Sequence, residues 1–215
     1  GGSTDCPETL VFGTWNIQGI GQRTSLLLPA AELAGADLVW VCETFYTEGA
    51  PWPRNDPLLF RTVAPRDLVT REARPGETPL EGSNTVLGPR RGRSEGGGGW
   101  LVGPRLDPTR LRELPGGIPG FASFLVLDEK VLIAGLYLQP TAPLEKTAQC
   151  LQFPDGPWEA TIVMGDLNAD LSTIRPATSH DAGRHRLLTE SLVVQRGLQV
   201  IQPVEGSVAS YLGGN

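Results

Sequence analysis

The sequence predicts an α/β fold in which mixed β-sheets are covered by helices. Three observations support this prediction. Apolar runs of strand length recur along the chain, two of them are joined by a short turn as a hairpin, and segments with helical spacing lie among them. The chain has 215 residues, of which 40% are hydrophobic and 20% charged, so we expect one domain with a sizeable core.

Two strands and a helix are predicted near the start of the chain. Residues Leu10 to Ile17 are rich in strand formers, and Gly19-Ile20-Gly21 ends the run. Residues Ser25 to Leu33 have helical spacing, and Pro29 requires the helix to begin or kink nearby. Residues Asp37 to Cys42 form a nearly continuous apolar run, which is typical of a strand covered on both faces.

The following region is harder to assign. Residues 48 to 99 are rich in Pro, Gly and Arg and show little periodicity. We expect long loops there, with one short strand or helix. The glycines at positions 96 to 99 then lead into a predicted strand at Trp100 to Val102.

The second half of the chain is predicted to supply more strands and another helix. Phe121 to Leu127 and Val131 to Leu138 are strands, and Asp128-Glu129-Lys130 is the hairpin turn between them. Ala160 to Met164 is a further strand. Residues 183 to 196 have apolar side chains at helical spacing, and Gly197 suits the position just after a helix. Leu198 to Ile201 is predicted as a last short strand.

Composition excludes several classes of protein. No apolar run reaches the roughly 18 residues of a membrane span, so we expect no membrane partner. The first residues lack the basic and apolar regions of a secretory signal, and we interpret residues 1–9 as a leader or tag. Three cysteines without metal-type spacing favour a reducing compartment. A net charge of −6 is unfavourable for a nucleic-acid binder that depends on a basic stripe, but is compatible with an enzyme that keeps carboxylates for a metal.

Gly165-Asp166-Leu167-Asn168, directly after the apolar run Ala160 to Met164, is the most informative segment. Side chains at i and i+2 of an extended segment share a face, so Asp166 and Asn168 are presented together where the strand ends. The carboxylate can orient a water or hold a metal, and the carboxamide can donate hydrogen bonds to an oxyanion. An Asx-rich turn without a functional role is the alternative interpretation.

Polar residues also follow two earlier strands at their carboxyl ends. Asn16 and Glu43 occupy these positions. If the strand ends gather at one edge of a sheet, the two side chains and the Asp166/Asn168 pair make a site.

Four motifs occur in a characteristic order: Trp15-Asn16-Ile17-Gln18-Gly19, Cys42-Glu43-Thr44, Tyr137-Leu138-Gln139-Pro140 and Gly165-Asp166-Leu167-Asn168. Through them the chain, from about residue 10 to 215, resembles the endonuclease/exonuclease/phosphatase superfamily, which includes deoxyribonuclease I and the apurinic endonucleases. The Gly-Asp-x-Asn-Ala form and the downstream Arg-Gly-Leu-Gln-Val-Ile segment are most similar to the endonuclease domains of non-LTR retrotransposons.

The resemblance implies a four-layer α/β sandwich, with two packed mixed β-sheets flanked by helices. It implies a Mg²⁺-dependent (or Mn²⁺-dependent) phosphodiester hydrolase, specifically a DNA-nicking endonuclease domain of a retrotransposon polyprotein. DNA is then the partner, a reverse-transcriptase domain is expected in the same polypeptide, and the expected location is intracellular, in the nucleus.

The resemblance also implies a role for each matching residue. Glu43 is the direct metal ligand, with Asp166 and Asn168 beside the ion as further ligands. Asn16 orients Glu43 or a metal-bound water. Tyr137 binds the scissile phosphate through its phenol. Asp166 orients and deprotonates the attacking water, and Asn168 donates to the phosphate oxygens in the transition state.

The one basic cluster, Arg90-Arg91-Gly92-Arg93, lies in the predicted long loops. We expect Arg90, Arg91 and Arg93 to contact phosphates of the substrate, because the superfamily places substrate-facing loops in this part of the chain. A solvated loop without a partner is the alternative.

The last part of the sequence departs from the superfamily pattern. The superfamily completes its site with an Asp near a late strand and a Ser-Asp-His segment, and neither is present. Ser179-His180-Asp181 has the inverted order and follows the Asp166 motif too soon. We therefore expect residues 10–215 to be an endonuclease-like domain that is incomplete at its C-terminus, as a piece of a longer protein. Missing strands supplied by another polypeptide, or a degenerate domain, are the alternatives.

Two other functions stay open. One is a phosphatase or phospholipid diesterase of the same superfamily, because a fold does not choose its substrate. The other is a catalytically silent nucleic-acid-binding or scaffolding module. The presence of Glu43 and Asp166 favours an enzyme, whereas the absence of the expected histidine favours the silent module.

Overall fold

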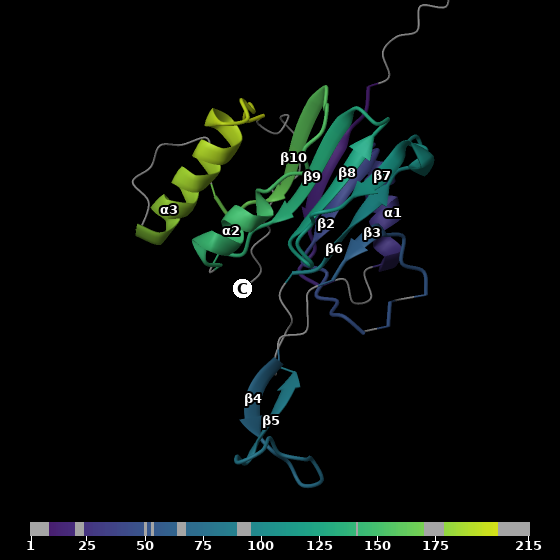
Figure 1. Ribbon diagram of the computed structural model, residues 1–215. Coiled ribbons are helices and arrows are strands. Elements are labelled where there is room, and N and C mark those ends of the chain that lie inside the picture. The colour runs from purple at the N-terminus through teal and green to yellow at the C-terminus, as the bar shows by residue number, and fades with distance from the viewer. Residues whose placement is uncertain are drawn as a thin grey trace, which may run out of the picture.

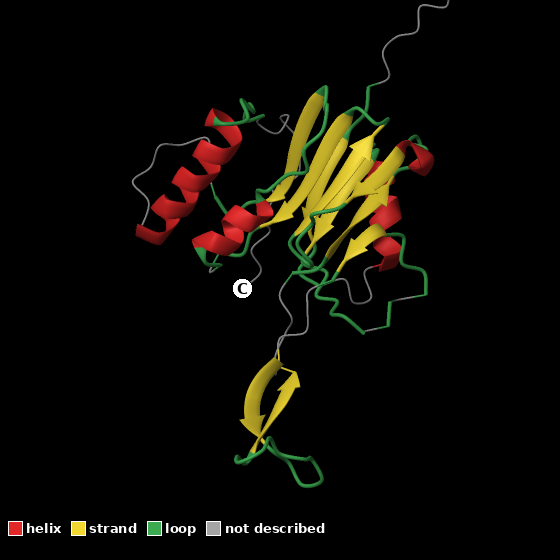
Figure 2. Ribbon diagram, in the orientation of Figure 1, coloured by secondary structure: helices red, strands yellow, loops and turns green. Residues whose placement is uncertain are grey.

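Two four-stranded mixed sheets, stacked face to face, form the body of the protein (Figures 1 and 2). The computed structural model describes residues 9–19, 24–49, 51–52, 54–63, 68–89, 96–140, 142–169 and 179–201. Helix α1 lies on one side of the stacked sheets, and α2 and α3 lie on the other (Figure 1). The predicted four-layer α/β sandwich is therefore confirmed.

The first sheet has the strand order β1-β2-β6-β3. Strands β1 (Phe12–Asn16) and β2 (Leu38–Cys42) are parallel, whereas β6 (Gly98–Val102) is antiparallel to both β2 and the edge strand β3 (Leu59–Thr62). Every residue of β2 is buried, as the continuous apolar run predicts. Helix α1 (Thr24–Leu33) covers the outer face, where it packs apolar side chains on those of β2 and β6.

The second sheet has the order β10-β9-β8-β7. Its strands are β7 (Leu111–Leu114), β8 (Ala122–Leu127), β9 (Val131–Tyr137) and β10 (Ala160–Asp166). β9 and β10 are parallel and the other pairs are antiparallel, with the predicted turn joining β8 to β9. Apolar residues of α2 (Leu144–Cys150), and residues at and after the end of α3 (Ser179–Leu188), join the same core cluster as this sheet.

A tryptophan pair joins the two sheets. Trp40 of β2 and Trp100 of β6 are opposite in register, fully buried, and have ring centroids 5.0 Å apart. The Trp40 Nε1–H donates to the Leu136 carbonyl at 3.2 Å, and the Trp100 Nε1–H donates to Ser123 Oγ at 2.9 Å. Each indole of the first sheet therefore has its hydrogen bond in the second, which fixes how the sheets lie on each other.

Several elements differ from the sequence-based expectation. The region 48–99 contains three strands before β6, because β3 is followed by the hairpin of β4 (Leu68–Glu72) and β5 (Thr85–Pro89). Side chains of β3 alternate between exposed and half-buried, so its sequence contains no continuous apolar run that would predict a strand. The sequence-based prediction also lacks the short elements β7 and α2.

The predicted strand at Leu198 to Ile201 is wrong. These residues have no ladder partner among the described strands, and Val200 and Ile201 are exposed. The helix predicted before them is confirmed, although it begins at Ser179 and continues after Leu188 as a π-helix over Thr189–Val194. Gly197 has a φ of +64°, the left-handed conformation expected after a helix.

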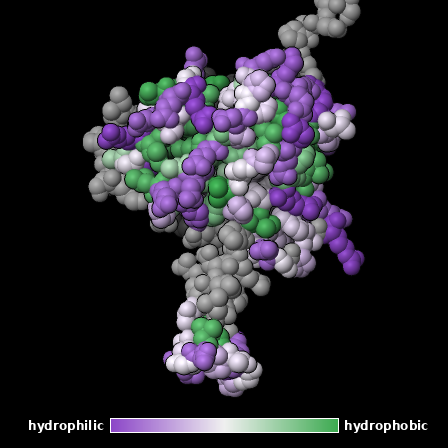
Figure 3. Space-filling model, viewed as in Figure 1, coloured by the Kyte–Doolittle hydropathy of each residue, from purple (hydrophilic) through white to green (hydrophobic). Residues whose placement is uncertain are grey.

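The surface gives no sign of a membrane segment. No helix in the described ranges is both long enough and apolar enough to cross a bilayer. On the face in Figure 3, hydrophobic residues are interspersed with hydrophilic ones. Cys42 and Cys150 are buried free thiols.

We predict that Gly135→Ala destabilises the protein. A Cβ at Gly135 would lie 2.5 Å from Trp40 Cδ2 and 2.7 Å from Trp100 Cζ2, so the tryptophan pair would have to move. Overpacking of this kind costs about 1–3 kcal/mol of unfolding free energy, which denaturant titration measures. Gly13→Ala is the matched control, because its nearest neighbour is at an ordinary 3.5 Å. Equal effects of the two substitutions would contradict this account of the sheet interface.

Candidate functional site

The carboxyl ends of four strands meet at one end of the sandwich. In the first sheet Asn16 ends β1 opposite Cys42, which ends β2. In the second sheet Asp166 ends β10 opposite Tyr137, which ends β9. Because β1 packs beside β10 across the two sheets, the polar residues at these strand ends come together from two sheets and not from one sheet edge.

A hydrogen bond between Asn16 and Asp166 connects the two sheets at this end. The Asn16 Nδ2 donates to Asp166 Oδ2 at 2.8 Å. The other oxygen, Asp166 Oδ1, accepts from the backbone N–H of Asn168 at 3.1 Å. The carboxylate is thus oriented by one donor on each oxygen. The sequence-based expectation pairs Asn16 with Glu43, whereas the structure gives it Asp166 as its hydrogen-bond partner.

Glu43 and Tyr137 form the second contact of the site. The Tyr137 hydroxyl donates to the Glu43 carboxylate, and the ring is 5% exposed. Burial raises the pKa of the Tyr137 phenol well above its usual value, and the hydrogen bond to Glu43 and the charges of Glu43 and Asp166 raise it further. Tyr137 is therefore a hydrogen-bond donor that keeps its proton.

The pKa of the neighbouring Cys42 thiol is affected by the same two carboxylates, Glu43 and Asp166. Burial raises the pKa of Cys42, and the charges of Asp166 and then Glu43 add to the effect. No lysine or arginine in the described part of the chain forms an ion pair with either carboxylate. Two carboxylates with no described counter-charge make this end of the sandwich a place where a cation is stabilised.

Asn168 is held against the end of the neighbouring strand. Its Nδ2 donates to the Leu138 carbonyl at 2.8 Å, while the Leu138 N–H donates to the Asp166 carbonyl at 2.9 Å. One proton of the carboxamide is thereby used for anchoring. The second proton of that nitrogen and the exposed side of the residue stay available to a ligand.

Left-handed backbone conformations occur at several positions of the site. Glu43 has a φ of +55° and Asn168 a φ of +46°. Asn adopts this region with little penalty, whereas Glu does so at a cost of about 1–2 kcal/mol. Gly165 has a φ of +144°, and a Cβ there would lie 1.9 Å from the Leu136 carbonyl oxygen. The backbone just before Asp166 therefore admits only glycine.

The residues present fit a hard divalent cation held largely by water and substrate. The described residues contain no group of three His, Cys, Asp or Glu side chains that could enclose a metal. Mg²⁺, however, is usually bound by one or two carboxylates and completes its octahedron with waters and phosphate oxygens. Glu43 and Asp166 supply such carboxylates.

The arginines predicted for the site and the two histidines of the sequence differ in how much of them the structure describes. Arg90, Arg91 and Arg93 lie outside the described residues. His185 lies on α3, which packs against α2, and its Nε2 is buried without a hydrogen-bond partner in the described part. The side chain of His180 is outside the described part. No described histidine contacts Glu43 or Asp166.

Sequence reasoning missed the aromatic neighbour of Tyr137 and the lysine that lies on it. The Phe121 ring stacks on that of Tyr137 with centroids 6.1 Å apart, and Lys146 Nζ lies 3.5 Å from the centroid of Phe121. Lys146 Nζ also lies 3.5 Å from Gln139 Oε1. No local pattern signals these contacts, because they join β8, β9 and α2.

Comparisons with known proteins find similar structures but no matching family model and no matching curated protein. The endonuclease domain of TRAS1, a telomere-specific non-LTR retrotransposon, is similar with 15% identity over 83% of this chain and 70% of that chain, at a TM-score of 0.45. The AP endonuclease LMAP from Leishmania major is similar with 16% identity over 83% of this chain and 64% of that chain, at a TM-score of 0.47. This chain therefore spans less than two thirds of the second protein. Functional inference depends on its own residues.

The left-handed conformation of Glu43 leads to a stability prediction. We expect Glu43→Gly to be more stable than Glu43→Ala by about 1 kcal/mol, because glycine relieves the strain at a φ of +55° and alanine keeps it. The measurement is the unfolding free energy of both variants under identical conditions. A glycine variant that is the less stable of the two would show that the backbone at Glu43 is unstrained.

Proposed function

We propose that this chain is a Mg²⁺-dependent or Mn²⁺-dependent phosphodiester hydrolase, and that its substrate is DNA, which it nicks on one strand. The observation that carries the proposal is the Asn16–Asp166 hydrogen bond across the two sheets, beside the Glu43–Tyr137 contact. An oriented carboxylate, an amide donor, a protonated phenol and a second carboxylate meet at one place. These are the groups that hydrolysis of a phosphodiester needs.

Asp166 is the proposed acceptor for the attacking water. Donors on both of its oxygens fix the plane of the carboxylate and leave the remaining lone pairs for a water proton. Holding the water in line with the phosphorus lowers the barrier through orientation, and accepting its proton adds general-base catalysis. Asn16 acts as a positioning residue for Asp166.

Asn168 and Tyr137 are proposed to bind the phosphate. The free proton of the Asn168 carboxamide donates to a non-bridging oxygen, and the anchoring bond to the Leu138 carbonyl holds this donor in place. Tyr137, which keeps its proton, donates its hydroxyl to another oxygen when it leaves Glu43. Glu43 would hold the divalent cation, with Asp166 and Asn168 beside it, and the ion would stabilise negative charge on the phosphate oxygens.

The described residues on either side of the basic cluster support a polynucleotide substrate. Thr62, which ends β3, is paired with Gly98 of β6, and Gly98 is paired with Cys42. The connection that carries the β4–β5 hairpin and Arg90 to Arg93 therefore leaves and rejoins the body at the end where the site lies. A basic segment there would contact phosphates beyond the one that is cleaved. With the motif resemblance, this favours a retrotransposon endonuclease domain spanning residues 10–215, which acts in the nucleus beside a reverse-transcriptase domain of the same polypeptide.

We predict that the chain nicks supercoiled plasmid in Mg²⁺ and that Asp166→Ala lowers the rate by at least about 10²-fold. The variant loses both the proton acceptor and the orientation of the water. Gel separation of supercoiled and open-circular DNA at excess protein measures the rate. Asp155→Ala is the matched control, because it removes an exposed carboxylate from the loop before β10, at the opposite end of that strand.

The same assay distinguishes the alternatives. A folded chain that binds plasmid and leaves it intact would be the silent nucleic-acid-binding module. A chain that ignores DNA and cleaves a phosphate monoester or a phospholipid would be a phosphatase or phospholipid diesterase of similar fold. Nicking at equal rates by the wild-type chain and Asp166→Ala would exclude the proposed role of Asp166.

The cation site gives a separate prediction. Calorimetric titration with Mn²⁺ should show weak binding that Glu43→Gln abolishes or weakens about 10-fold or more, since the substitution removes the charge and a carboxylate oxygen. Glu159→Gln is the control, because Glu159 is exposed, pairs with Lys130 and precedes β10 at its other end. Binding that is the same in Glu43→Gln and in the wild type would place the cation elsewhere.

A further inference from the structure

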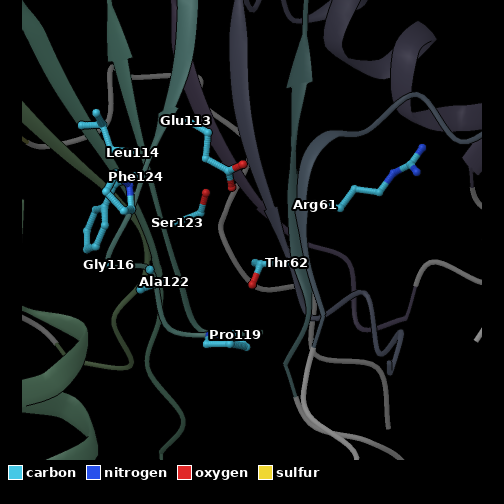
Figure 4. Close-up of a pocket in the computed structure, with 11 residues that line it drawn as sticks. Arg61, Thr62, Glu113, Leu114, Gly116, Pro119, Ala122, Ser123 and Phe124 are labelled. Atoms are coloured by element: carbon cyan, nitrogen blue, oxygen red, sulfur yellow. The ribbon is translucent and has the colours of Figure 1, made fainter. Parts of the chain in front are cut away.

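A pocket of about 350 Å³ opens between the edge of the first sheet and the β7–β8 hairpin of the second (Figure 4). Its lining includes Thr62 at the end of β3, Glu113 on β7 and Ser123 on β8. The loop between β7 and β8 adds prolines and glycines, among them Pro115, Gly116 and Pro119. The volume is within the range of small-ligand sites. None of the roles proposed for the strand-end residues uses it.

The pocket lies at the same end of the sandwich as the candidate site. Thr62 is linked by strand register through Gly98 to Cys42. In the second sheet Ala122 is opposite Leu136, and the next residue, Tyr137, donates its N–H to the Phe121 carbonyl at 2.7 Å. The stacked rings of Phe121 and Tyr137 therefore stand between the pocket and the proposed phosphate site.

The spacing of the two sites matches a polynucleotide. The pocket is built on β8 and β7, the first and second neighbours of β9, which carries Tyr137. Neighbouring strands are about 4.8 Å apart and residues along a strand about 3.4 Å apart. By register Ser123 is level with Gly135 and Glu113 with Ile133, so they lie about 8 Å and about 17 Å from Tyr137. Successive bases along one strand are about 3.4 Å apart along the helix axis. A base in the pocket would belong to a nucleotide about two to five steps from the cleaved phosphate.

Glu113 gives the pocket an unpaired acceptor. Its side chain lies toward the space between the sheets with Ser123 nearby (Figure 4). Glu113 is exposed on the edge strand, and no hydrogen bond or ion pair of its carboxylate occurs within the described part of the chain. Partial desolvation raises the pKa of Glu113 above its usual value. An anionic carboxylate repels phosphate. The pocket therefore selects a ligand edge that carries N–H donors.

The arginine in the lining does not neutralise Glu113. Arg61 extends away from the pocket centre in Figure 4. Its Nε lies 3.0 Å from Asp56 Oδ2 and donates to the Leu58 carbonyl at 2.9 Å, and its guanidinium lies 4.7 Å from the centroid of Trp52. These contacts hold the cation on the outer side of β3.

Two hydroxyl groups supply donors beside the carboxylate. Ser123 Oγ accepts from Trp100 Nε1 at 2.9 Å, and Thr62 Oγ1 accepts from the Gly120 N–H at 2.7 Å. Each oxygen already accepts a hydrogen bond from within the protein, so its own proton is left to donate. Thr62 is half-buried, and Ser123 is 3% exposed. The pocket thus presents a carboxylate acceptor next to hydroxyl donors.

We propose that this pocket binds an unpaired guanine base of the DNA strand, a few nucleotides from the cleaved phosphate. Among the DNA bases, guanine alone has two adjacent N–H donors, N1–H and N2–H₂, followed by a carbonyl acceptor, O6. Glu113 accepts from the two donors, and the hydroxyls of Ser123 and Thr62 donate to O6. The assignment to DNA rests on the proposed nuclease function, while the base preference itself rests on the pocket.

The test is fluorescence-anisotropy binding of short single-stranded oligothymidylates that carry one central guanine, hypoxanthine or adenine, without Mg²⁺. Hypoxanthine lacks only the N2 amino group of guanine. We expect the wild-type chain to bind the guanine strand about 10-fold more tightly than the hypoxanthine strand. Glu113→Gln should lose this preference, because the carboxamide no longer offers two acceptor oxygens.

Glu129→Gln is the matched control. It makes the same charge change at the opposite end of the β7–β8 pair, where Glu129 contacts Arg112. This variant should keep the guanine preference. Thermal unfolding of both variants checks that the fold is unchanged, and Glu113→Asp provides a second variant with a carboxylate if Glu113→Gln fails to fold.

Three outcomes would overturn the proposal. Equal binding of guanine and hypoxanthine strands by the wild type would remove the base preference. A guanine preference that survives in Glu113→Gln would show that Glu113 does not recognise the base. If that variant also associates into larger species, the role of Glu113 is to prevent the edge strand β7 from pairing with another chain. Guanosine monophosphate that binds as tightly as the strand would make the pocket a free-nucleotide site. A guanine preference in a chain that does not nick plasmid would instead contradict only the nuclease function.

Discussion

The arrangement of the whole molecule depends on the contact of Trp40 and Trp100 with the second sheet. Both indoles are fully buried, so an indole N–H without an acceptor would cost about 1–3 kcal/mol. The acceptors are the Leu136 carbonyl and Ser123 Oγ, on two adjacent strands of the facing sheet. Gly135 leaves the space that the rings fill. The sheets can therefore slide very little on each other.

This constraint places the candidate site. The strand ends that carry Asn16 and Asp166 belong to different sheets, and a 2.8 Å hydrogen bond between their side chains requires the sheets to be aligned closely. The same alignment separates β3 from β7 by the width of a pocket, beside Phe121 and Tyr137. The apolar interface thus determines the geometry of the polar end, because a close-packed interior shifts very little when side chains at its edge change.

The polar end is built at the expense of stability. Glu43 has a left-handed backbone, and the charges of Glu43 and Asp166 raise the pKa of both Cys42 and Tyr137. The backbone conformation of Glu43 is unfavourable in the isolated fold, whereas Cys42 and Tyr137 stay protonated at neutral pH and their raised pKa values cost no stability there. The chain has a net charge of −6, which repels DNA. Under the proposed function, a bound cation would offset the local repulsion and the Arg90–Arg93 segment would supply positive charge elsewhere.

Local sequence determined the elements whose signal is local. The buried run of β2 and the β8–β9 hairpin follow from apolar continuity and turn length. The two-residue period of a strand does not relate Asp166 to Asn168, because β10 ends at Asp166 and Asn168 has a φ of +46° in a turn, where its N–H donates to Asp166 Oδ1. Tertiary structure alone decided that Asn16 orients Asp166 across 150 residues of sequence, that Phe121 stacks on Tyr137, and that Glu113 lines a pocket. It also decided against a strand at Leu198 to Ile201, which has suitable residues and no described partner. The periodicity of apolar residues in a segment indicates which of its side chains face the core and which face solvent. Which segments become neighbours depends on the packing of two sheets, which no single segment encodes.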